Sequence, residues 1–533
     1  MKHYIDNFAH DHLPPAELQP EYIYDHADFQ MPSDLNCVDK LLDRHIREGN
    51  GDSTAIRTFD VKWSFGALFE KSNQIAHVLI DDMKLVPGNR VLIRSANNPM
   101  YVACWFAIIK AGGIVVATMP LLREKELSTM VECAEISHAL CDFRLLDELQ
   151  NVKSDFLKNT IAFDGTEQTG SELEKLMATK PVTFDNYKSK SDSICLIGFT
   201  SGTTGNPKMT AHYHKDVLLV CEAFPKYALQ PTPNDIFTGS PPLGFTFGLG
   251  GLVLFPFYYG ASTFLIEKPS PELLLQAIQD FKITICFTAP TAWRLITAKV
   301  SDFDVSSLRR CVSAGETLPA KIWQDWYDAT GLKIIDGIGS TEMLHIFISS
   351  EENNFKVGST GLPVRGYEAR IIDDQGNQVP TNTPGRLAVR GITGCKYLNR
   401  EEKQREYVEN GWNLTGDIFK KDEDGYYWFV ARGDDMIISS GYNIGAIEVE
   451  SVLLLHPEVA ECAVVGLPDS ERGMLVCAHI VLQNHEKCCP ELGVEIQDWF
   501  KKNAAPYKYP RVINFTQTLP KTETGKIQRF RLK

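Results

Sequence analysis

The chain contains 533 residues, which is too many for a single hydrophobic core and predicts several domains. It carries 54 Lys and Arg residues against 68 Asp and Glu residues, so its formal net charge is −14. A net acidic chain argues against nucleic acid or an anionic membrane as the main partner, although a local cationic loop is enough to bind a nucleotide.

The cysteines and the most apolar segments predict the cellular compartment of the protein. The 13 cysteines form no Cys-x-x-Cys pair, and several, such as Cys104, Cys195 and Cys286, lie within apolar stretches, as in reduced intracellular proteins. No apolar segment follows the first methionine, so we expect no signal peptide and a cytoplasmic location. The most apolar segment, 101–122, contains Lys110 and a Gly-Gly pair, which is typical of a buried helix and strand rather than of a membrane span.

After a lead-in over about the first 50 residues, short apolar runs alternate with helical stretches. Over 51–190 we expect strands at 90–94 and 113–117 on either side of a helix at 100–111. The same pattern continues over 191–360. In both segments it predicts a doubly wound parallel sheet with helices on both faces.

The pattern changes over 361–432. Apolar and polar residues alternate at 367–372 and 385–390 on either side of turn residues, which predicts a small antiparallel, β-barrel-like subdomain. Strand and helix patterns then resume over 435–533. The predicted fold class is therefore α/β, with a large N-terminal domain over 1–432 and a small α+β C-terminal domain.

One loop has the composition of a phosphate-binding site. After an apolar run at 194–199, nine residues read Thr200-Ser201-Gly202-Thr203-Thr204-Gly205-Asn206-Pro207-Lys208. Glycines let backbone N–H groups approach an anion, hydroxyls donate further hydrogen bonds, and the lysine supplies a charge. The spacing is not that of the Walker P-loop. A surface loop rich in Thr, Ser and Gly is the alternative, which the complete nonapeptide disfavours.

Two further segments carry groups suited to a nucleotide. Residues 336–342 read Asp-Gly-Ile-Gly-Ser-Thr-Glu, in which the glycines allow a base to approach the backbone closely. Glu342 offers the kind of carboxylate that Mg²⁺ prefers beside phosphates. Near the C-terminus, Lys526 follows a Thr-Gly turn within 520–529, which would project its ammonium group from a loop.

These motifs, in this order, resemble the adenylate-forming superfamily, which includes acyl- and aryl-CoA synthetases, nonribosomal adenylation domains and luciferases. The nonapeptide is similar to the superfamily's phosphate-binding signature, and the similarity extends over nearly the whole chain. The resemblance implies a ligase that uses ATP, Mg²⁺ and CoA. It would first form an acyl-adenylate from a carboxylic acid and then an acyl-CoA thioester.

The resemblance assigns roles to individual residues. Thr341 and Glu342 would reach the α-phosphate and Mg²⁺, and the catalytic lysines would be Lys526 and Lys208. Residues expected to bind ATP or AMP are Thr200, Ser201, Gly202, Thr203, Thr204, Lys208, Ala314, Gly315, Glu316, Asp336, Gly337, Ile338, Gly339, Ser340, Thr341, Asp417, Arg432 and Lys526. Ile338 or its neighbour stands where the superfamily usually has Tyr or Trp, so the adenine would stack on a smaller surface.

The resemblance also implies that the C-terminal domain is mobile. Asp434 falls on the superfamily's hinge position, which places the hinge at 433–434. In one orientation the domain would deliver Lys526 for adenylation. In the other, a loop of Ser440, Gly441 and Tyr442 would line a channel for CoA. The expected partners are small molecules, with no nucleic acid and no membrane, and a homodimer is compatible with the sequence.

A closer resemblance concerns the acid. Residues 6–15 and 336–345 are similar to the corresponding segments of benzoate- and 2-aminobenzoate-CoA ligases. The acyl pocket would be lined by Thr246, Phe247, Ile338, Gly339 and His345. A small slot with an aromatic wall suits an aryl acid. A core histidine on an apolar helix explains His345 equally well.

Other functions stay open at this point. A medium-chain fatty acyl-CoA ligase would carry the same nucleotide motifs, and so would an adenylation enzyme that serves a separate carrier protein. A non-catalytic nucleotide sensor would be expected to lose Lys526 or Glu342, and both are present. His212 and His214 are spaced like a metal-binding pair, but no third ligand lies near them in the sequence.

Overall fold

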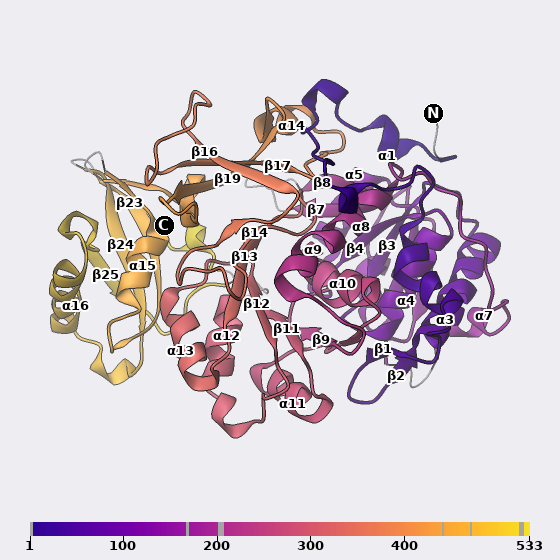
Figure 1. The fold of residues 1–533 in the computed structure, drawn as a ribbon, viewed down its shortest axis with the longest axis horizontal. Coiled ribbons are helices and arrows are strands. Elements are labelled where there is room, and N and C mark those ends of the chain that lie inside the picture. Colours follow the sequence, from indigo (N-terminus) through magenta and orange to yellow (C-terminus); the bar gives the residue numbers. More distant parts are fainter. Residues whose placement is uncertain (1–3, 167–169, 201–206, 440–441, 470–471, 522–526) are drawn as a thin grey trace.

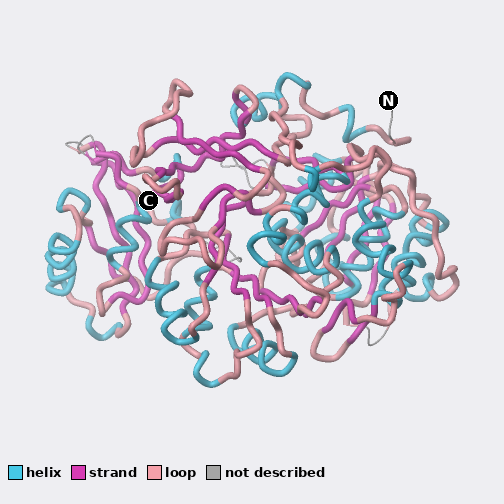
Figure 2. Tube along the Cα trace, viewed as in Figure 1, coloured by secondary structure: helices cyan, strands magenta, loops and turns pink. Residues whose placement is uncertain are grey.

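The structure is a computed structural model that describes residues 4–166, 170–200, 207–439, 442–469, 472–521 and 527–533. Within these ranges the strands form four sheets (Figure 1). We call residues 4–432 the body and residues 435–533 the C-terminal unit. Figure 2 shows strands running through the interior of both, with most helices on the outer sides.

One sheet of the body contains six described strands in the order β6-β5-β3-β4-β7-β8. These are β3 (Arg90–Arg94), β4 (Ile114–Thr118), β5 (His138–Asp142), β6 (Asn159–Phe163), β7 (Ile194–Thr200) and β8 (Lys208–Tyr213). Neighbouring strands are parallel except β7 and β8, which form an antiparallel hairpin. Its helices are α3 (Phe65–His77), α4 (Pro99–Lys110), α5 (Glu124–Ala134), α6 (Leu146–Gln150), α7 (Glu172–Met177) and α8 (His214–Glu222).

A second sheet contains nine described strands in the order β15-β14-β13-β12-β11-β9-β10-β1-β2. They are β1 (Thr54–Arg57), β2 (Lys62–Ser64), β9 (Ile236–Gly239), β10 (Ser262–Phe264), β11 (Ile285–Thr288), β12 (Arg310–Ala314), β13 (Ile334–Gly339), β14 (Ile346–Ser349) and β15 (Leu362–Pro363). Helices between them are α9 (Thr246–Leu249), α10 (Phe255–Tyr258), α11 (Pro271–Phe281), α12 (Pro290–Thr297) and α13 (Ala320–Thr330). The short helices α1 (Phe8–Asp11) and α2 (Arg44–Arg47) precede β1.

From the alternation we expected the two large sheets to divide at residue 190, but they do not. Strands β1 and β2 lie before that residue but pair into the nine-stranded sheet, through β10. Strands β7 and β8 lie after it but extend the six-stranded sheet, through β4. The alternation of apolar runs locates strands, but strand pairing over long sequence separations decides which sheet each strand joins.

The remaining sheets are antiparallel in the main. In the body, a five-stranded sheet is formed by β16 (Tyr367–Ile372), β17 (Gly385–Gly391), β18 (Val408–Glu409), β19 (Trp412–Lys421) and β20 (Tyr427–Arg432), with α14 (Glu401–Tyr407) beside it. The C-terminal unit contains β21 (Ile437–Ser439), β22 (Tyr442–Ile444), β23 (Val459–Asp469), β24 (Gly473–Leu482) and β25 (Val512–Phe515), with α15 (Ala446–Leu453) and α16 (Pro490–Asn503). Figure 1 shows α16 at the far side of the molecule from α3 and α4.

Helix α4 is the buried centre of the six-stranded half. The Asn98 side chain caps its start by accepting a hydrogen bond from the backbone N–H of Tyr101 at 3.0 Å. Every residue of α4 is buried, and its last side chain, Lys110, donates to Asp43 at 2.5 Å. No helix in the described part of the chain is both long enough and apolar enough to span a membrane.

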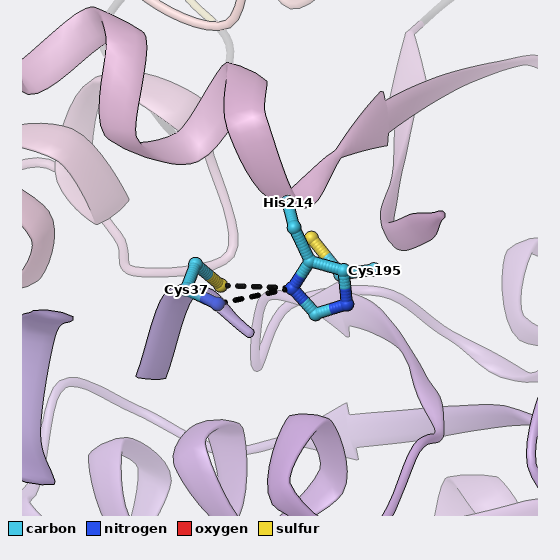
Figure 3. Close-up of side chains that lie close together, drawn as sticks. All are labelled: Cys37, Cys195 and His214. Atoms are coloured by element: carbon cyan, nitrogen blue, oxygen red, sulfur yellow. Dashed lines mark hydrogen bonds between the residues drawn. The ribbon is translucent and has the colours of Figure 1, made fainter. Parts of the chain in front are cut away.

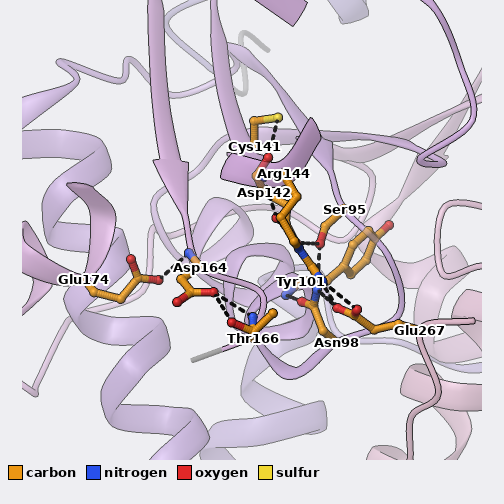
Figure 4. Close-up of polar contacts among 10 residues, drawn as sticks. All are labelled: Ser95, Asn98, Tyr101, Cys141, Asp142, Arg144, Asp164, Thr166, Glu174 and Glu267. Atoms are coloured by element: carbon orange, nitrogen blue, oxygen red, sulfur yellow. Dashed lines mark hydrogen bonds and ion pairs between the residues drawn. The ribbon is translucent and has the colours of Figure 1, made fainter. Parts of the chain in front are cut away.

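A polar cluster that is buried at Asp142 and Asn98 and partly exposed at Arg144 and Glu267 joins the two large sheets (Figure 4). Asp142 ends β5 and accepts a hydrogen bond from Arg144 Nε at 2.8 Å. Arg144 also donates to Glu267, which follows β10, at 2.8 and 2.7 Å. Asn98 donates to the same glutamate at 2.9 Å. Because these charges are paired across the junction, the carboxyl edges of the two sheets are held in a defined relative position.

Candidate active site

The hairpin of β7 and β8 carries the predicted phosphate loop at its tip. Thr200 ends β7 and pairs in register with Lys208, which begins β8. The loop residues Ser201, Gly202, Thr203 and Thr204 lie outside the described residues, as does Lys526. Thr200 and Lys208 therefore mark where the loop leaves and re-enters the sheet.

The Tyr397 hydroxyl connects two of the predicted catalytic residues, although no motif in the sequence singles out Tyr397. It donates a hydrogen bond to Glu342 Oε1 at 2.5 Å and accepts one from Lys208 Nζ at 3.0 Å. The Lys208 ammonium also lies 4.6 Å from the centre of the Tyr397 ring. Tyr397 is held beside β8 because Leu398 N–H donates to the carbonyl of Met209 at 2.9 Å. The predicted lysine and the predicted Mg²⁺ ligand are thus joined by one buried phenol.

The backbone of Thr341 is held in place by a hydrogen bond from the β7–β8 hairpin. His212, on β8, lies 2.8 Å from the Thr341 carbonyl, so its Nε2 donates. Burial, and then the charge of Lys396, lower the pKa of His212 to about 4, which keeps the imidazole neutral at neutral pH. A Cβ on Gly198 would meet Thr341 Cγ2 at 2.6 Å, so only glycine leaves room for this threonine.

The two segments expected to hold the adenosine are neighbours in the nine-stranded sheet. Ala314 at the end of β12 pairs with Gly337 on β13. Gly315 follows with φ +90°, a conformation that favours glycine, and Thr291 donates to Glu316 at 2.9 Å. Register and turn therefore bring these two predicted nucleotide segments to the same edge.

Asp336 differs from the other predicted nucleotide residues. Its carboxyl is buried, and burial raises its pKa well above the ordinary value. Its backbone binds the Ser349 and Ser350 hydroxyls at 2.8 and 2.9 Å, whereas Oδ1 has no hydrogen-bond partner among the described residues. The structure therefore places the side chain of Asp336 in the protein interior, where burial favours the uncharged form. The motif by itself does not show this difference between Asp336 and its neighbours. Side chains at alternate positions of a strand face opposite sides of the sheet.

The predicted ribose pair lies on the five-stranded sheet. Asp417 and Arg432 are register partners on β19 and β20, and Arg432 Nη1 lies 2.8 Å from Asp417 Oδ1. Gly416 has φ +78°, and a Cβ there would approach the Arg432 guanidinium to 3.1 Å. The turn before Asp417 thus makes room for the arginine.

The predicted acyl residues meet in an aromatic cluster. The His345 ring centre lies 5.8 Å from that of Phe247 on α9 and 4.5 Å from that of Phe255 on α10. His345 is 3% exposed, and burial lowers its pKa to about 3, so the imidazole is neutral at neutral pH. A Cβ on Gly250 would come within 2.2 Å of this ring, so the glycine is required beside it. Thr246 lies on α9 with Phe247.

The backbone of β13 connects this cluster to the nucleotide side. A Cβ on Gly339 would meet the His345 carbonyl at 2.7 Å, and Ile338 packs against the main core. Ser340 accepts a hydrogen bond from the Met343 N–H at 3.2 Å, which turns the chain between them. Residues 339–345 therefore begin and end at predicted acyl residues, Gly339 and His345, and carry Glu342 between them.

The hinge and CoA residues fall partly outside the described residues. Residues Gly433–Asp435 form a 3-10 turn between β20 and β21. Ser440 and Gly441 are not described, and nor is the Asp434 side chain. Tyr442 is 54% exposed on the C-terminal unit, and its ring stacks on that of Tyr507 with centres 4.5 Å apart.

His212 and His214 do not act as a pair. The His212 side chain contacts Thr341, as described, whereas His214 faces Cys37 and Cys195 (Figure 3). His214 Nδ1 accepts the backbone N–H of Cys37 at 3.2 Å, so its lone pair is already used, and Nε2 lies 3.4 Å from the Tyr4 hydroxyl. We interpret this cluster as hydrogen-bonded packing rather than as a metal centre.

Comparison with known proteins finds similar sequences and structures. Residues 42–396 match the AMP-binding enzyme family, and residues 448–526 match the AMP-binding enzyme C-terminal domain. The chain is 32% identical to a benzoate–CoA ligase of Thauera aromatica, over 98% of each chain. It is also 32% identical to the mitochondrial acyl-coenzyme A synthetase ACSM3 of Homo sapiens, over 89% of this chain and 83% of that protein. A crystal structure of the anthranilate CoA ligase AuaEII in complex with anthranoyl-AMP superposes with a TM-score of 0.89 and 35% identity, over 95% of this chain and 98% of that one.

The Tyr397 hydroxyl gives a direct test of the site. Hydrogen bonds to charged groups contribute about 1.5–3 kcal/mol. We therefore expect Tyr397→Phe to lower the acid-dependent release of pyrophosphate from ATP by about ten- to a hundredfold. Tyr227→Phe, which removes a tyrosine–carboxylate bond to Asp28, is the matched control and should be unaffected. Wild-type rates in Tyr397→Phe would contradict the role given to this hydroxyl.

Proposed function

This chain belongs to the AMP-binding enzyme family, and we propose that it is an ATP-dependent ligase that joins an aromatic carboxylic acid to coenzyme A. One observation carries the aromatic assignment: residues 339–345 connect the Phe- and His-lined cluster to Glu342. An aryl ring held by that cluster would present its carboxylate toward the predicted α-phosphate position. The benzoate–CoA ligase and the anthranoyl-AMP complex among the relatives support the same class of acid.

In the first half-reaction, the carboxylate of the acid attacks the α-phosphate of ATP and pyrophosphate leaves. We assign charge stabilisation to Lys208, Thr341 and Lys526. Glu342 fits a magnesium ion because its buried carboxylate is held in one orientation by Tyr397. When bound, Mg²⁺ would neutralise phosphate charge.

Binding of ATP is assigned to the loop after β7 for the phosphates and to the edges of β12, β13 and β19 for the adenosine part. The proposed contacts are made by Thr200, Ser201, Gly202, Thr203, Thr204, Ala314, Gly315, Glu316, Gly337, Ile338, Gly339, Ser340, Asp417 and Arg432. We give Asp336 a supporting role through its backbone, because its carboxyl is buried.

In the second half-reaction, the thiolate of CoA attacks the acyl-adenylate carbonyl and AMP leaves. We propose that the C-terminal unit turns about Asp434 between the two steps, so that Ser440, Gly441 and Tyr442 line the path of CoA. The exposed Tyr442 ring on that unit is compatible with this role.

A medium-chain fatty acyl-CoA ligase is the second candidate, and the similarity to acyl-coenzyme A synthetase ACSM3 favours it. An adenylation enzyme for a separate carrier protein would share the first half-reaction. It would release the acyl group to a protein thiol rather than to CoA.

A substrate panel tests the proposed function. We expect pyrophosphate release from ATP with benzoate and 2-aminobenzoate, and much less with hexanoate or acetate, because the acyl cluster is built of aromatic rings. Acyl-CoA should then accumulate when CoA is added. A preference for hexanoate would contradict the aryl assignment and favour the medium-chain candidate. Adenylate formation without transfer to CoA would favour the carrier-protein alternative.

Separate assays of the two half-reactions test Lys526. Loss of one preorganised donor costs about 3–4 kcal/mol, so Lys526→Ala should lower adenylation by about 10²–10³-fold. Thioester formation from supplied acyl-AMP and CoA should be retained, because the lysine acts only in the first step. Lys501→Ala, on α16, is the control. Equal loss of both half-reactions would refute the division of roles.

The His345 side chain is proposed to distinguish substituted from unsubstituted rings. It is a neutral polar group among Phe side chains, so it can form a hydrogen bond with a 2-amino group. A neutral hydrogen bond contributes about 0.5–1.5 kcal/mol. His345→Leu should therefore lower kcat/KM for 2-aminobenzoate about three- to tenfold more than for benzoate. Phe255→Leu, a change to the same cluster, should affect both acids alike. An unchanged ratio in His345→Leu would exclude this role.

A further inference from the structure

A network of three charges connects the body to the C-terminal unit. Arg294 lies on α12 of the body, and its Nη1 donates to the carbonyl of Ala460 at 2.7 Å. Its Nη2 donates to the carboxylate of Glu461 on β23. One arginine therefore binds both a backbone carbonyl and a side chain of the C-terminal unit.

Glu461 is shared with a second cation. Lys521 Nζ lies 2.8 and 3.0 Å from its two carboxylate oxygens. Burial opposes ionisation of Glu461, but the bond from Lys521 and the charge of Arg294 outweigh burial and hold its pKa below the ordinary value. The side chains are 29%, 20% and 29% exposed for Arg294, Glu461 and Lys521, so solvent screens this network only in part.

On the body side, this network is connected to the predicted nucleotide site. Thr291 lies one turn before Arg294 on α12, and its hydroxyl donates to Glu316 at 2.9 Å. Residues three apart share one face of a helix. The same face of α12 therefore contacts both the predicted adenosine segment and the C-terminal unit.

On the other side, the network is connected to the base of the segment that contains Lys526. Lys521 immediately precedes residues 522–526, which lie outside the described residues, and it pairs with Ile527 in an antiparallel bridge. The N–H of Gln528 donates to the carbonyl of Pro520 at 2.8 Å. The two ends of that segment are thus held together, and Glu461 binds one of them.

We propose that Arg294 and Glu461 are positioning residues that hold the C-terminal unit in the orientation used for adenylation. This inference rests on the proposed two-step ligase function. The two residues touch neither substrate nor cofactor, and they act by favouring one arrangement of the two parts. The arrangement must open for the second step, and this contact, made of one partly exposed ion pair and one backbone hydrogen bond, can open at modest cost.

The two residues differ in what their loss leaves behind. In Arg294→Ala, Glu461 keeps Lys521 as a partner inside the C-terminal unit, so only the link to the body is lost. In Glu461→Gln, Arg294 and Lys521 remain as two adjacent cations around a neutral amide, and they repel each other. Glu461→Gln should therefore weaken the adenylation arrangement more than Arg294→Ala does.

The experiment measures each half-reaction separately in the full-length variants. We expect Arg294→Ala to lower kcat for acid-dependent ATP–pyrophosphate exchange about tenfold, with little change in KM for acid or ATP, and Glu461→Gln to lower it further. Thioester formation from supplied acyl-AMP and CoA should stay at the wild-type rate or rise. Arg294→Lys, which keeps the charge, should recover part of the exchange activity. Arg405→Ala, which removes an ion pair within α14, is the matched control and should match the wild type.

The outcomes separate this inference from the proposed function. If the wild type shows no exchange with any acid, the ligase function itself fails. If the wild type is active but both half-reactions fall equally in Arg294→Ala, or neither changes, the positioning role is overturned. A thermal midpoint within a few degrees of the wild type shows that a variant is folded. If Arg294→Ala is not folded, the half-reaction rates of Arg294→Lys are compared with those of the wild type, and they test the positioning role in the same way.

Discussion

The predicted catalytic centre depends on one buried hydroxyl group. Tyr397 donates to Glu342 and accepts from Lys208, and these two residues come from different large sheets of the body. A buried carboxylate and a partly buried ammonium need partners of fixed geometry, because unpaired burial of either is costly. The phenol supplies such a partner to both, so the relative position of the two sheets fixes the relative position of the two charges.

A second set of buried charges stabilises this arrangement. Lys396 and Asp216 are fully buried and lie 3.0 Å apart, between the segment that carries Tyr397 and helix α8. The backbone of Lys396 also accepts the N–H of Ala211 on β8 at 2.9 Å. Separating β8 from the Tyr397 segment would expose or unpair these groups, which makes the site rigid. By contrast, the described contacts of Arg294 with the C-terminal unit are few and partly exposed. The proposed two-step reaction needs such a rigid body together with a second unit that can change its orientation.

Much of the local structure followed from the sequence. The apolar runs located β3, β4 and α4 to within a residue or two, and the alternation after residue 360 predicted the five-stranded sheet. Gly315 and Gly416 stand where the backbone has positive φ, which residue type alone suggests. The nonapeptide and the segment of Glu342 were singled out by their composition, because the chemistry of phosphate binding restricts residue types in a short stretch.

The amino-acid sequence by itself determined the α/β class, the family resemblance and most of the nucleotide-binding segments, because each is encoded within a few consecutive residues. Only the tertiary structure decided which sheet β1, β2, β7 and β8 join, since strand pairing links residues far apart in the chain. It also decided that Asp336 faces the interior and that Tyr397 meets Glu342, 55 positions away in the sequence. No local pattern encodes such contacts, because they depend on packing between separate elements.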